Sequence, residues 1–420
     1  IADKRMVLNS TWLRDSCHCN KCTHHHSRQR LMTAKDFRRE MFVISDISFV
    51  SKTGNPLNSL SDTTDEGFLE VKWADGHESS YSLSWLSCLA SIFKQAKFRS
   101  SHLNVARFKY PNDDFYLPKE GNKPQLEHWN VAKIVRSLAP IEYDELVDGF
   151  QFSDDSNFIN ANRVSEMSKK RLNAISTLAS QLVHYGLCKV VNVPMERGQV
   201  LKVARSLAYE RPTGYGTIFD VVIEPSEEIN LAYSSLEFDL HSDLTYREMS
   251  PGVQLLHCIM NSEGGGLSYF CDAFNAAQIL KVSDPELFSI LCSFPATFVV
   301  RDPYRNMKFR RQQPVLTLDS LGDLKDVYYS PFMLPPVGNL SDVKMFYVAF
   351  DKLTQLLQDE ENKFIVKMER GDLFIFHNRR ILHGRSAYDA TKSGRFLQGC
   401  YMDWDEITSL YEKLHSTCLL

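Results

Sequence analysis

Apolar residues between Val164 and Val183 recur at helical spacing, which indicates a helix with one buried face. Gly186 follows the last of them, and glycine is favoured just beyond a helix end. Residues 187–193 then form a short apolar run that is typical of a buried strand. The pattern therefore predicts a helix that begins near residue 162, ends at Gly186 and leads directly into a strand.

Further along the chain, short apolar runs alternate with segments of helical period. The predicted strands are residues 253–259, 267–271, 298–300, 315–318, 327–329, 373–376 and 396–401. The predicted helices are residues 273–280, 285–292 and 341–357. Many strands without a regular strand–helix–strand alternation argue against a parallel sheet and predict an α+β or mainly β fold. Periodicity alone does not distinguish a double-stranded β-helix (jelly roll) from other folds of this class.

The first part of the chain has a different pattern. Residues 1–95 contain short strand-like runs joined by polar loops, and residues 96–160 are mixed and rich in Pro, Asp, Asn and Lys. We therefore expect a small N-terminal β domain over 1–95, a connector over 96–160 with a helix near 129–138, and a main domain over 161–420.

Composition narrows the possible functions. A chain of 420 residues, of which 43% are hydrophobic, is long enough for two cores. Its net charge of −4 leaves no basic surplus to neutralise phosphates, so we expect no nucleic-acid partner. We find no apolar run of eighteen residues and no signal or transit segment, so no membrane association is expected. The chain begins at Ile1 rather than Met, and a leader before it would be invisible in this sequence.

Three of the ten cysteines, Cys17, Cys19 and Cys22, lie in one short segment, while the others are scattered in apolar surroundings. Scattered cysteines are typical of small buried side chains in a reducing compartment. Three clustered thiolates repel one another unless a cation neutralises them, and Zn²⁺ in a closed four-ligand site does so. His77 is the predicted fourth ligand because it follows an Asp-Gly turn between two strand-like runs. The alternatives are free thiols, or one of the nearby histidines His18, His24, His25 and His26 as the ligand.

The pattern that indicates chemistry is His241-Ser242-Asp243 followed by His383. Side chains two apart on a strand point to the same side, so His241 and Asp243 can face one metal ion. Two imidazoles and one carboxylate leave up to three positions open on an octahedral Fe(II) ion, enough for a co-substrate and O2. His-x-Asp also occurs by chance, and the chain has thirteen histidines.

Arg395 strengthens the iron interpretation because it begins a strand-like run shortly after His383. A 2-oxoglutarate oxygenase needs a fixed cation for the far carboxylate of its co-substrate. The planar guanidinium suits this role, since it binds a carboxylate through two hydrogen bonds and stays protonated. Taken alone, Arg395 could equally be a solvated surface cation.

Four segments carry a resemblance to the family of γ-butyrobetaine and trimethyllysine dioxygenases, and the similarity runs over nearly the whole chain. These segments are residues 12–22 (WLRDSCHCNKC), 73–77 (WADGH), 251–258 (PGVQLLHC) and 382–385 (LHGR). The resemblance implies a jelly-roll catalytic domain and a small zinc-binding domain. It also implies Fe(II) bound by His241, Asp243 and His383, 2-oxoglutarate anchored by Arg395, and ascorbate as reductant. A homodimer, a cytoplasmic or mitochondrial location and a role in carnitine biosynthesis are further expectations.

Aromatic residues before and after the proposed iron ligands match the substrate cage of that family. A quaternary ammonium cannot donate a hydrogen bond, so proteins hold it by cation–π contacts inside an aromatic box. By the resemblance, Tyr215, Phe219, Tyr233 and Tyr401 would form this box, and Asn230 would contact the substrate carboxylate. Without the resemblance, aromatic residues of a barrel core are the simpler interpretation.

Two departures from the family concern the substrate. Phe219 stands where the butyrobetaine enzymes have Trp, which is the better cation–π partner. Ser330-Pro331 stands where the family has an Asn pair, one amide of which helps to hold the butyrobetaine carboxylate. A related betaine or another small amine therefore stays open as the substrate.

We therefore expect Fe(II)- and 2-oxoglutarate-dependent hydroxylation of a small zwitterion, γ-butyrobetaine first. Asp243 argues for hydroxylation over halogenation, which needs Gly or Ala at this position. One alternative is trimethyllysine hydroxylation, which an acidic pocket residue would favour. Others are a demethylase on the same barrel and a zinc-stabilised binding module with a vestigial iron site.

Overall fold

The structure is a computed structural model that describes residues 8, 10–23, 39–51, 67–86, 126–148, 167–222, 235–302, 305–334, 343–389 and 394–415. The chain divides into two compact units, residues 1–118 and 119–420. The described residues of the predicted connector belong to the second unit, because β4 (Ile141–Glu142) pairs with β5 (Leu187–Val191) of its sheet. The observed boundary thus lies inside the predicted connector.

The first unit is built on a three-stranded antiparallel sheet in the order β1 (Ile44–Val50), β2 (Phe68–Trp73), β3 (Glu78–Ser82). Short helices precede it, α1 (Ser10–Asp15) and η2 (Arg39–Phe42). The two strand-like runs around His77 do form a hairpin, and its turn uses Gly76 at a φ of 78°, where glycine avoids a steric penalty. Trp73 and Tyr81 are buried at the centre of this unit.

The two largest sheets of the second unit enclose its core, as a jelly roll requires. The six-stranded sheet has the order β4, β5, β15 (Leu373–His377), β8 (Val253–Met260), β17 (Phe396–Met402), β6 (Phe219–Val221). The four-stranded sheet has the order β14 (Lys363–Val366), β9 (Ser268–Asp272), β16 (Ile381–Arg385), β7 (Phe238–His241). Phe270 of β9 and Phe374 of β15 pack with ring centroids 4.7 Å apart, so the two sheets face each other. The predicted fold is confirmed.

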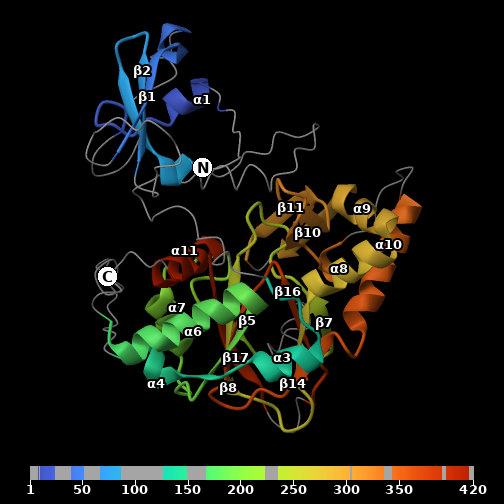
Figure 1. The fold of residues 1–420 in the computed structure, drawn as a ribbon. Helices are drawn as coiled ribbons and strands as arrows, with labels where there is room; N and C mark the ends of the chain where they lie inside the picture. The colour runs from blue at the N-terminus through green and yellow to red at the C-terminus, as the bar shows by residue number, and fades with distance from the viewer. Residues whose placement is uncertain are drawn as a thin grey trace. The chain divides into compact units, whose positions relative to one another are not determined.

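Helices α6 (Lys169–Tyr185), α7 (Gln199–Leu207) and α11 (Trp404–His415) cover the outer face of the six-stranded sheet (Figure 1). The α6 helix begins at the N-cap Ser168, whose hydroxyl accepts a hydrogen bond from Arg171 N–H, and ends at Gly186 with a φ of 72°. The C-terminal boundary was predicted correctly. Two short helices, α3 (Val131–Ser137) and α4 (Tyr143–Leu146), lie in the same unit.

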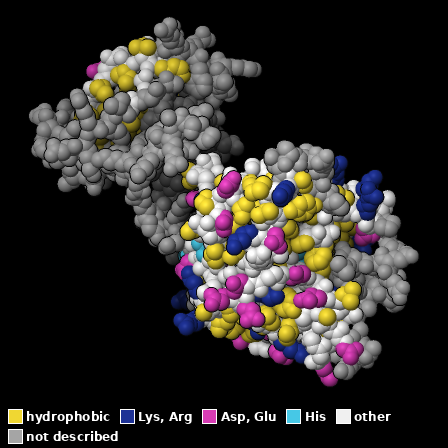
Figure 2. All heavy atoms as spheres, turned by 90° about the vertical axis from the view of Figure 1, so that its right-hand side faces the viewer, with side chains coloured by type: hydrophobic (Ala, Val, Ile, Leu, Met, Phe, Trp, Pro, Cys, Tyr) yellow, Lys and Arg dark blue, Asp and Glu magenta, His cyan; other side chains and the backbone are white. Residues whose placement is uncertain are grey.

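A second group of helices packs around the other end of the unit. It comprises α8 (Ala273–Ser283), α9 (Pro285–Ser293) and α10 (Val343–Gln358), with β10 (Ala296–Asp302), β11 (Met307–Gln313), β12 (Leu316–Leu318), β13 (Leu324–Val327) and η6 (Pro331–Met333). On the face shown in Figure 2, basic and acidic side chains of the described residues are interspersed. None of the helices in the described ranges is both long enough and apolar enough to cross a membrane.

Candidate metal centre and cavity

His241 and His383 come together because their strands are neighbours, and Asp243 follows in the turn directly after β7. β7 ends at His241, and β16 places His383 opposite it in antiparallel register. His241 Nε2 lies 3.3 Å from Asp243 Oδ1, and His383 Nε2 lies 3.9 Å from Asp243 Oδ2. One ligand atom from each residue lies within 4.8 Å of the others. The three side chains that the sequence singled out thus form one cluster in the interior.

The protonation state of the cluster suits a metal ion. His241 Nδ1 lies 2.7 Å from the carbonyl oxygen of Asp239, which can only accept, so the proton is on Nδ1. Nε2 then carries a lone pair that faces an oxygen of Asp243 and is buried without a donor. Burial, together with the neighbouring His241, lowers the pKa of His383 to about 3, so the His383 imidazole is neutral. Lone pairs that face one another are stable when a cation lies between them.

Asp243 is held on both its backbone and its side chain. Asn378 Oδ1 accepts a hydrogen bond from Asp243 N–H at 2.8 Å, and Asn378 Nδ2 donates to Asp243 O at 3.0 Å. The hydroxyl of Tyr401 donates to Asp243 Oδ2 at 2.7 Å. Burial opposes ionisation of the carboxyl, whereas the hydrogen bond from Tyr401 favours the carboxylate. Asn378 was not predicted, since a single amide far along the chain carries no local pattern.

The backbone directly after Asp243 is strained. Leu244 has a φ of 56°, a left-handed conformation that L-residues with bulky side chains rarely adopt. The hydroxyl of Ser250 donates to Leu244 O at 2.8 Å, and the Leu244 side chain is buried in the core. Strain of this kind persists where the surrounding structure enforces it, as it does at functional sites.

Arg395 is a buried cation directly before the first residue of β17. Its side chain is 6% exposed, and Nε has no hydrogen-bond partner among the described residues. Burial and the charge of Arg385 lower the pKa of Arg395 to about 10. Gly266, at a φ of 66°, lies beside its stem, since a Cβ at Gly266 would be in van der Waals contact with Arg395 Cδ at 3.5 Å. The guanidinium lies 5.9 Å from the ring centroid of Tyr388, but its unpaired Nε leaves a buried donor for which an anion is a fitting partner.

The metal cluster and Arg395 line one cavity. Its other polar lining groups include Ser242, Tyr246, Gln254, Ser268, Ser330 and Arg385. Tyr215, Phe219 and Tyr401 line the same cavity, as the resemblance implied, and the rings of Phe219 and Tyr401 stack with centroids 4.9 Å apart. Asn230 and Tyr233 lie outside the described residues. Tyr246, whose hydroxyl lies 3.4 Å from that of Tyr215, is a cavity residue that was not predicted.

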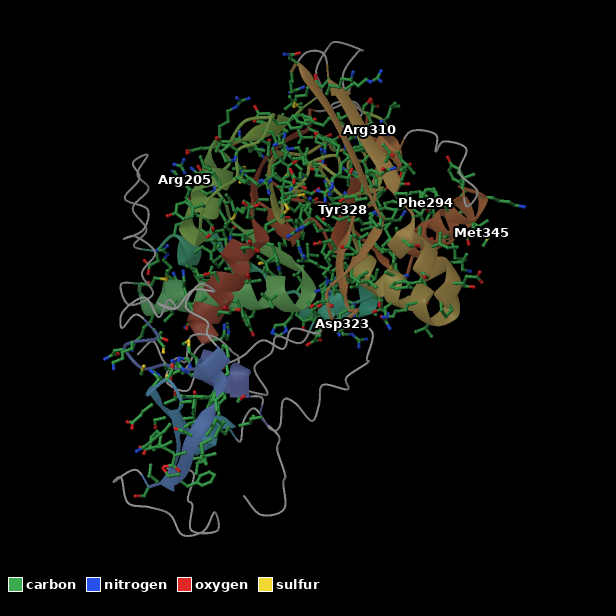
Figure 3. The ribbon with its side chains drawn as sticks, turned by 90° about the horizontal axis from the view of Figure 1, so that it is seen from above. Arg205, Phe294, Arg310, Asp323, Tyr328 and Met345 are labelled. Atoms are coloured by element: carbon green, nitrogen blue, oxygen red, sulfur yellow. The ribbon has the colours of Figure 1, made fainter. Side chains whose placement is uncertain are left out.

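Ser330 is the residue of the altered family segment that reaches the cavity. Its neighbours Tyr328 and Tyr329 belong to the core instead (Figure 3 labels Tyr328), and the hydroxyl of Tyr329 lies 2.9 Å from that of Thr354. Ser330 is 2% exposed, so its small hydroxyl occupies the wall where the family has an amide.

The three clustered cysteines and His77 of the first unit also lie close together. The Sγ atoms of Cys17, Cys19 and Cys22 lie 3.3, 3.6 and 3.7 Å from His77 Nε2. Arg14 donates to Cys22 Sγ at 3.3 Å. A hydrogen bond from Cys17 and the guanidinium of Arg14 lower the pKa of Cys22 to about 5, which favours the thiolate. This set has the composition of a closed structural zinc site. Histidines 24–26 lie outside the described residues.

Comparison with known proteins gives two family matches. The profile of the family described as Taurine catabolism dioxygenase TauD, TfdA family matches residues 158–401. The profile described as Gamma-butyrobetaine hydroxylase-like, N-terminal matches residues 2–87.

Three curated relatives are similar over nearly the whole chain. A γ-butyrobetaine dioxygenase of Pseudomonas sp. (strain AK-1) is 29% identical, over 97% of this chain and 91% of its own. Dioxygenase str8 of Strobilurus tenacellus is 28% identical, over 94% of this chain and 82% of its own. A trimethyllysine dioxygenase of Meyerozyma guilliermondii is 24% identical, over 96% of this chain and 89% of its own.

Proposed function

We propose, on the premise that this chain belongs to the TauD, TfdA family of dioxygenases, that it hydroxylates γ-butyrobetaine to carnitine with Fe(II) and 2-oxoglutarate. One observation carries the proposal. A single cavity is lined by the His-Asp-His cluster, by a buried arginine whose Nε has no hydrogen-bond partner among the described residues, and by an aromatic wall. These are the groups that a metal, an anionic co-substrate and a quaternary ammonium require.

In this proposal, His241, Asp243 and His383 would hold Fe(II), and Arg395 would bind the far carboxylate of 2-oxoglutarate. Bound iron, with 2-oxoglutarate and O2, supplies the oxidising power for an unactivated C–H bond. The protein's own contribution is orientation: the ligand strands fix the metal, and the walls select which carbon faces it. The largely apolar lining also keeps bulk water away from that carbon.

The trimethylammonium group would lie against Tyr215, Phe219 and Tyr401, with Tyr233 as a further proposed wall, and Asn230 would contact the substrate carboxylate. Ser330 would face the substrate where the family has an amide, so it offers one short hydroxyl in place of a longer donor. We therefore expect γ-butyrobetaine to bind this protein less tightly than it binds an enzyme with the Asn pair.

Trimethyllysine is the second candidate, supported by the 24% identical relative. Trimethyllysine carries an additional α-ammonium group, which needs an acidic partner. Among the described cavity residues, Asp243 is the only carboxylate, and it faces the histidines, whereas Arg385 and Arg395 are both cations. This charge distribution favours the butyrobetaine, which has no second ammonium.

The test is succinate and hydroxylated product formation by the Fe(II)-loaded protein with 2-oxoglutarate and ascorbate. We expect γ-butyrobetaine to stimulate both products strongly and trimethyllysine to stimulate them weakly. The variant His241→Ala should abolish both while it keeps the wild-type circular dichroism. The reverse substrate preference would replace the butyrobetaine assignment, and full turnover by His241→Ala would refute the metal site.

For the first unit, we propose that Cys17, Cys19, Cys22 and His77 bind a structural Zn²⁺ ion. All four positions of a tetrahedral ion would be filled, which leaves no place for a reactant. A homodimer and a cytoplasmic location, the other expectations from the family, stay predictions.

A further inference from the structure

Tyr401 contacts both the aromatic wall and the proposed metal ligand. Its ring stacks on Phe219 at 4.9 Å, and its hydroxyl donates to Asp243 Oδ2 at 2.7 Å. The backbone of Tyr401 is fixed on both sides, since it pairs with Gln254 of β8 and its carbonyl accepts from Arg211 N–H at 2.7 Å. A residue predicted only as a cage wall therefore has a second contact that no family pattern suggested.

The two carboxylate oxygens of Asp243 have different neighbours. Oδ2 accepts the hydrogen bond from Tyr401 and lies 3.9 Å from His383 Nε2, whereas Oδ1 lies closer to a histidine, 3.3 Å from His241 Nε2. A carboxylate that binds a metal through both oxygens occupies two coordination positions, and one that binds through a single oxygen occupies one. The proposed chemistry needs the second arrangement, because two positions must accept 2-oxoglutarate and a third must accept O2.

We propose that Tyr401 is a positioning residue that makes Asp243 a one-oxygen metal ligand and connects that ligand to the substrate wall. A cation held against the Tyr401 ring polarises its O–H group and strengthens its bond to Asp243 Oδ2. Substrate binding would thereby tighten the geometry of the metal site. This second step rests on the proposed trimethylammonium substrate, whereas the positioning of Asp243 does not.

The chain offers a matched control in the same cavity. Tyr215 also lines the cavity and also has a hydroxyl contact, but that contact is Tyr246 at 3.4 Å rather than Asp243. The variants Tyr401→Phe and Tyr215→Phe each remove one hydroxyl and keep the aromatic ring. Only the first removes a hydrogen bond to the carboxylate.

The first measurement is the affinity of the zinc-loaded protein for Mn²⁺. The electron paramagnetic resonance signal of free Mn²⁺ reports how much of the added ion stays unbound. Mn²⁺ prefers oxygen and nitrogen ligands, so it reports on the His-Asp-His cluster and not on the thiolates. We expect Tyr401→Phe to bind Mn²⁺ about 10-fold to 100-fold more weakly, the usual effect of losing a partner of a metal ligand. Tyr215→Phe should match the wild type, and both variants should keep wild-type circular dichroism. Equal affinity of Tyr401→Phe and wild type overturns the proposal.

Two further readouts separate positioning from a general loss of structure. In an Asp243→Ala background, adding Tyr401→Phe should change Mn²⁺ affinity no further, because the hydroxyl then has no carboxylate to hold. Tyr401→Phe should also form more succinate for each hydroxylated product than the wild type does. An additive effect in the Asp243→Ala background refutes the proposal. If γ-butyrobetaine proves not to be the substrate, the Mn²⁺ measurements still decide the role of Tyr401.

Discussion

Replacing Arg395 by Met should stabilise the protein without ligands and, at the same time, weaken the binding of 2-oxoglutarate. The guanidinium is 6% exposed, and its pKa falls from the ordinary 12.5 to about 10 because of burial and the nearby charge of Arg385. At about 1.36 kcal/mol for each pKa unit, keeping this buried group charged costs the folded state about 3 kcal/mol. Met has a similar length and no charge, so the variant should recover part of that energy.

The affinity for 2-oxoglutarate should decrease in the same variant, although its stability without ligands increases. A carboxylate held by a guanidinium gains about 1.5–3 kcal/mol for each hydrogen bond, so the variant should bind 2-oxoglutarate at least about 10-fold more weakly. In calorimetry with Mn²⁺ present, excess 2-oxoglutarate should raise the melting temperature of the wild type, because it binds only the folded state. The variant should melt at a higher temperature without 2-oxoglutarate and shift little when it is added.

Arg385→Met is the matched control. This second cavity arginine is equally buried, but its Nη1 donates to Leu236 O at 2.6 Å. Its removal leaves a backbone carbonyl without that donor, so we expect a lower melting temperature. The reasoning about Arg395 fails if Arg395→Met melts below the wild type without 2-oxoglutarate, or if both arginine variants lose stability equally.

Three further predictions concern stability. Arg380→Met should lower the free energy of unfolding in urea by about 3–5 kcal/mol, because it leaves the fully buried Asp272 carboxylate without its cation at 2.8 Å; unchanged unfolding would contradict this. Cys19→Ser should reduce zinc content by metal analysis and expose the first unit to protease, while Mn²⁺ binding in the second unit persists. Glu210→Gln should lower the melting temperature at pH 7. Hydrogen bonds from Arg205 (labelled in Figure 3) lower the pKa of Glu210 against the effect of burial. This carboxylate stabilises the fold above its unfolded pKa, so the difference in melting temperature between wild type and variant should vanish as the pH falls below 4.5 through the lowered pKa.

The sequence predicted the long apolar elements well and missed the strands that carry the ligands. The predicted strands 253–259 and 396–401 are β8 and β17, and the predicted helix 285–292 is α9. In contrast, β7 (FDLH) and β16 (ILHGR) were not predicted. Both are short, and their apolar pattern is interrupted by the polar residues that face the cavity. The chemistry of the site therefore obscures the local signal of the strands that support it.

One predicted strand ends earlier than expected because its last residue pairs with a distant part of the fold. The run 327–329 was assigned as strand, but β13 ends at Val327. Tyr329 instead exchanges hydrogen bonds with Ser242, whose N–H donates to Tyr329 O at 2.6 Å. This pairing supports the segment between the two ligands His241 and Asp243. No spacing within 327–329 indicates such a partner, because it lies 87 residues away and depends on the tertiary fold.

The buried polar groups around the cluster fall into two classes, and the division marks where ligands are expected. Two residues of the turn between β15 and β16 are held by several hydrogen bonds: Asn378 binds the backbone of Asp243, and Arg380 binds Asp272 together with two backbone carbonyls. Such a turn fixes the positions of the ligand strands before any metal binds. By contrast, His241 Nε2 and Arg395 Nε are buried without partners in the described structure. Burial of unpartnered groups is costly, so a cation at His241 Nε2 and an anion at Arg395 Nε would each remove such a cost.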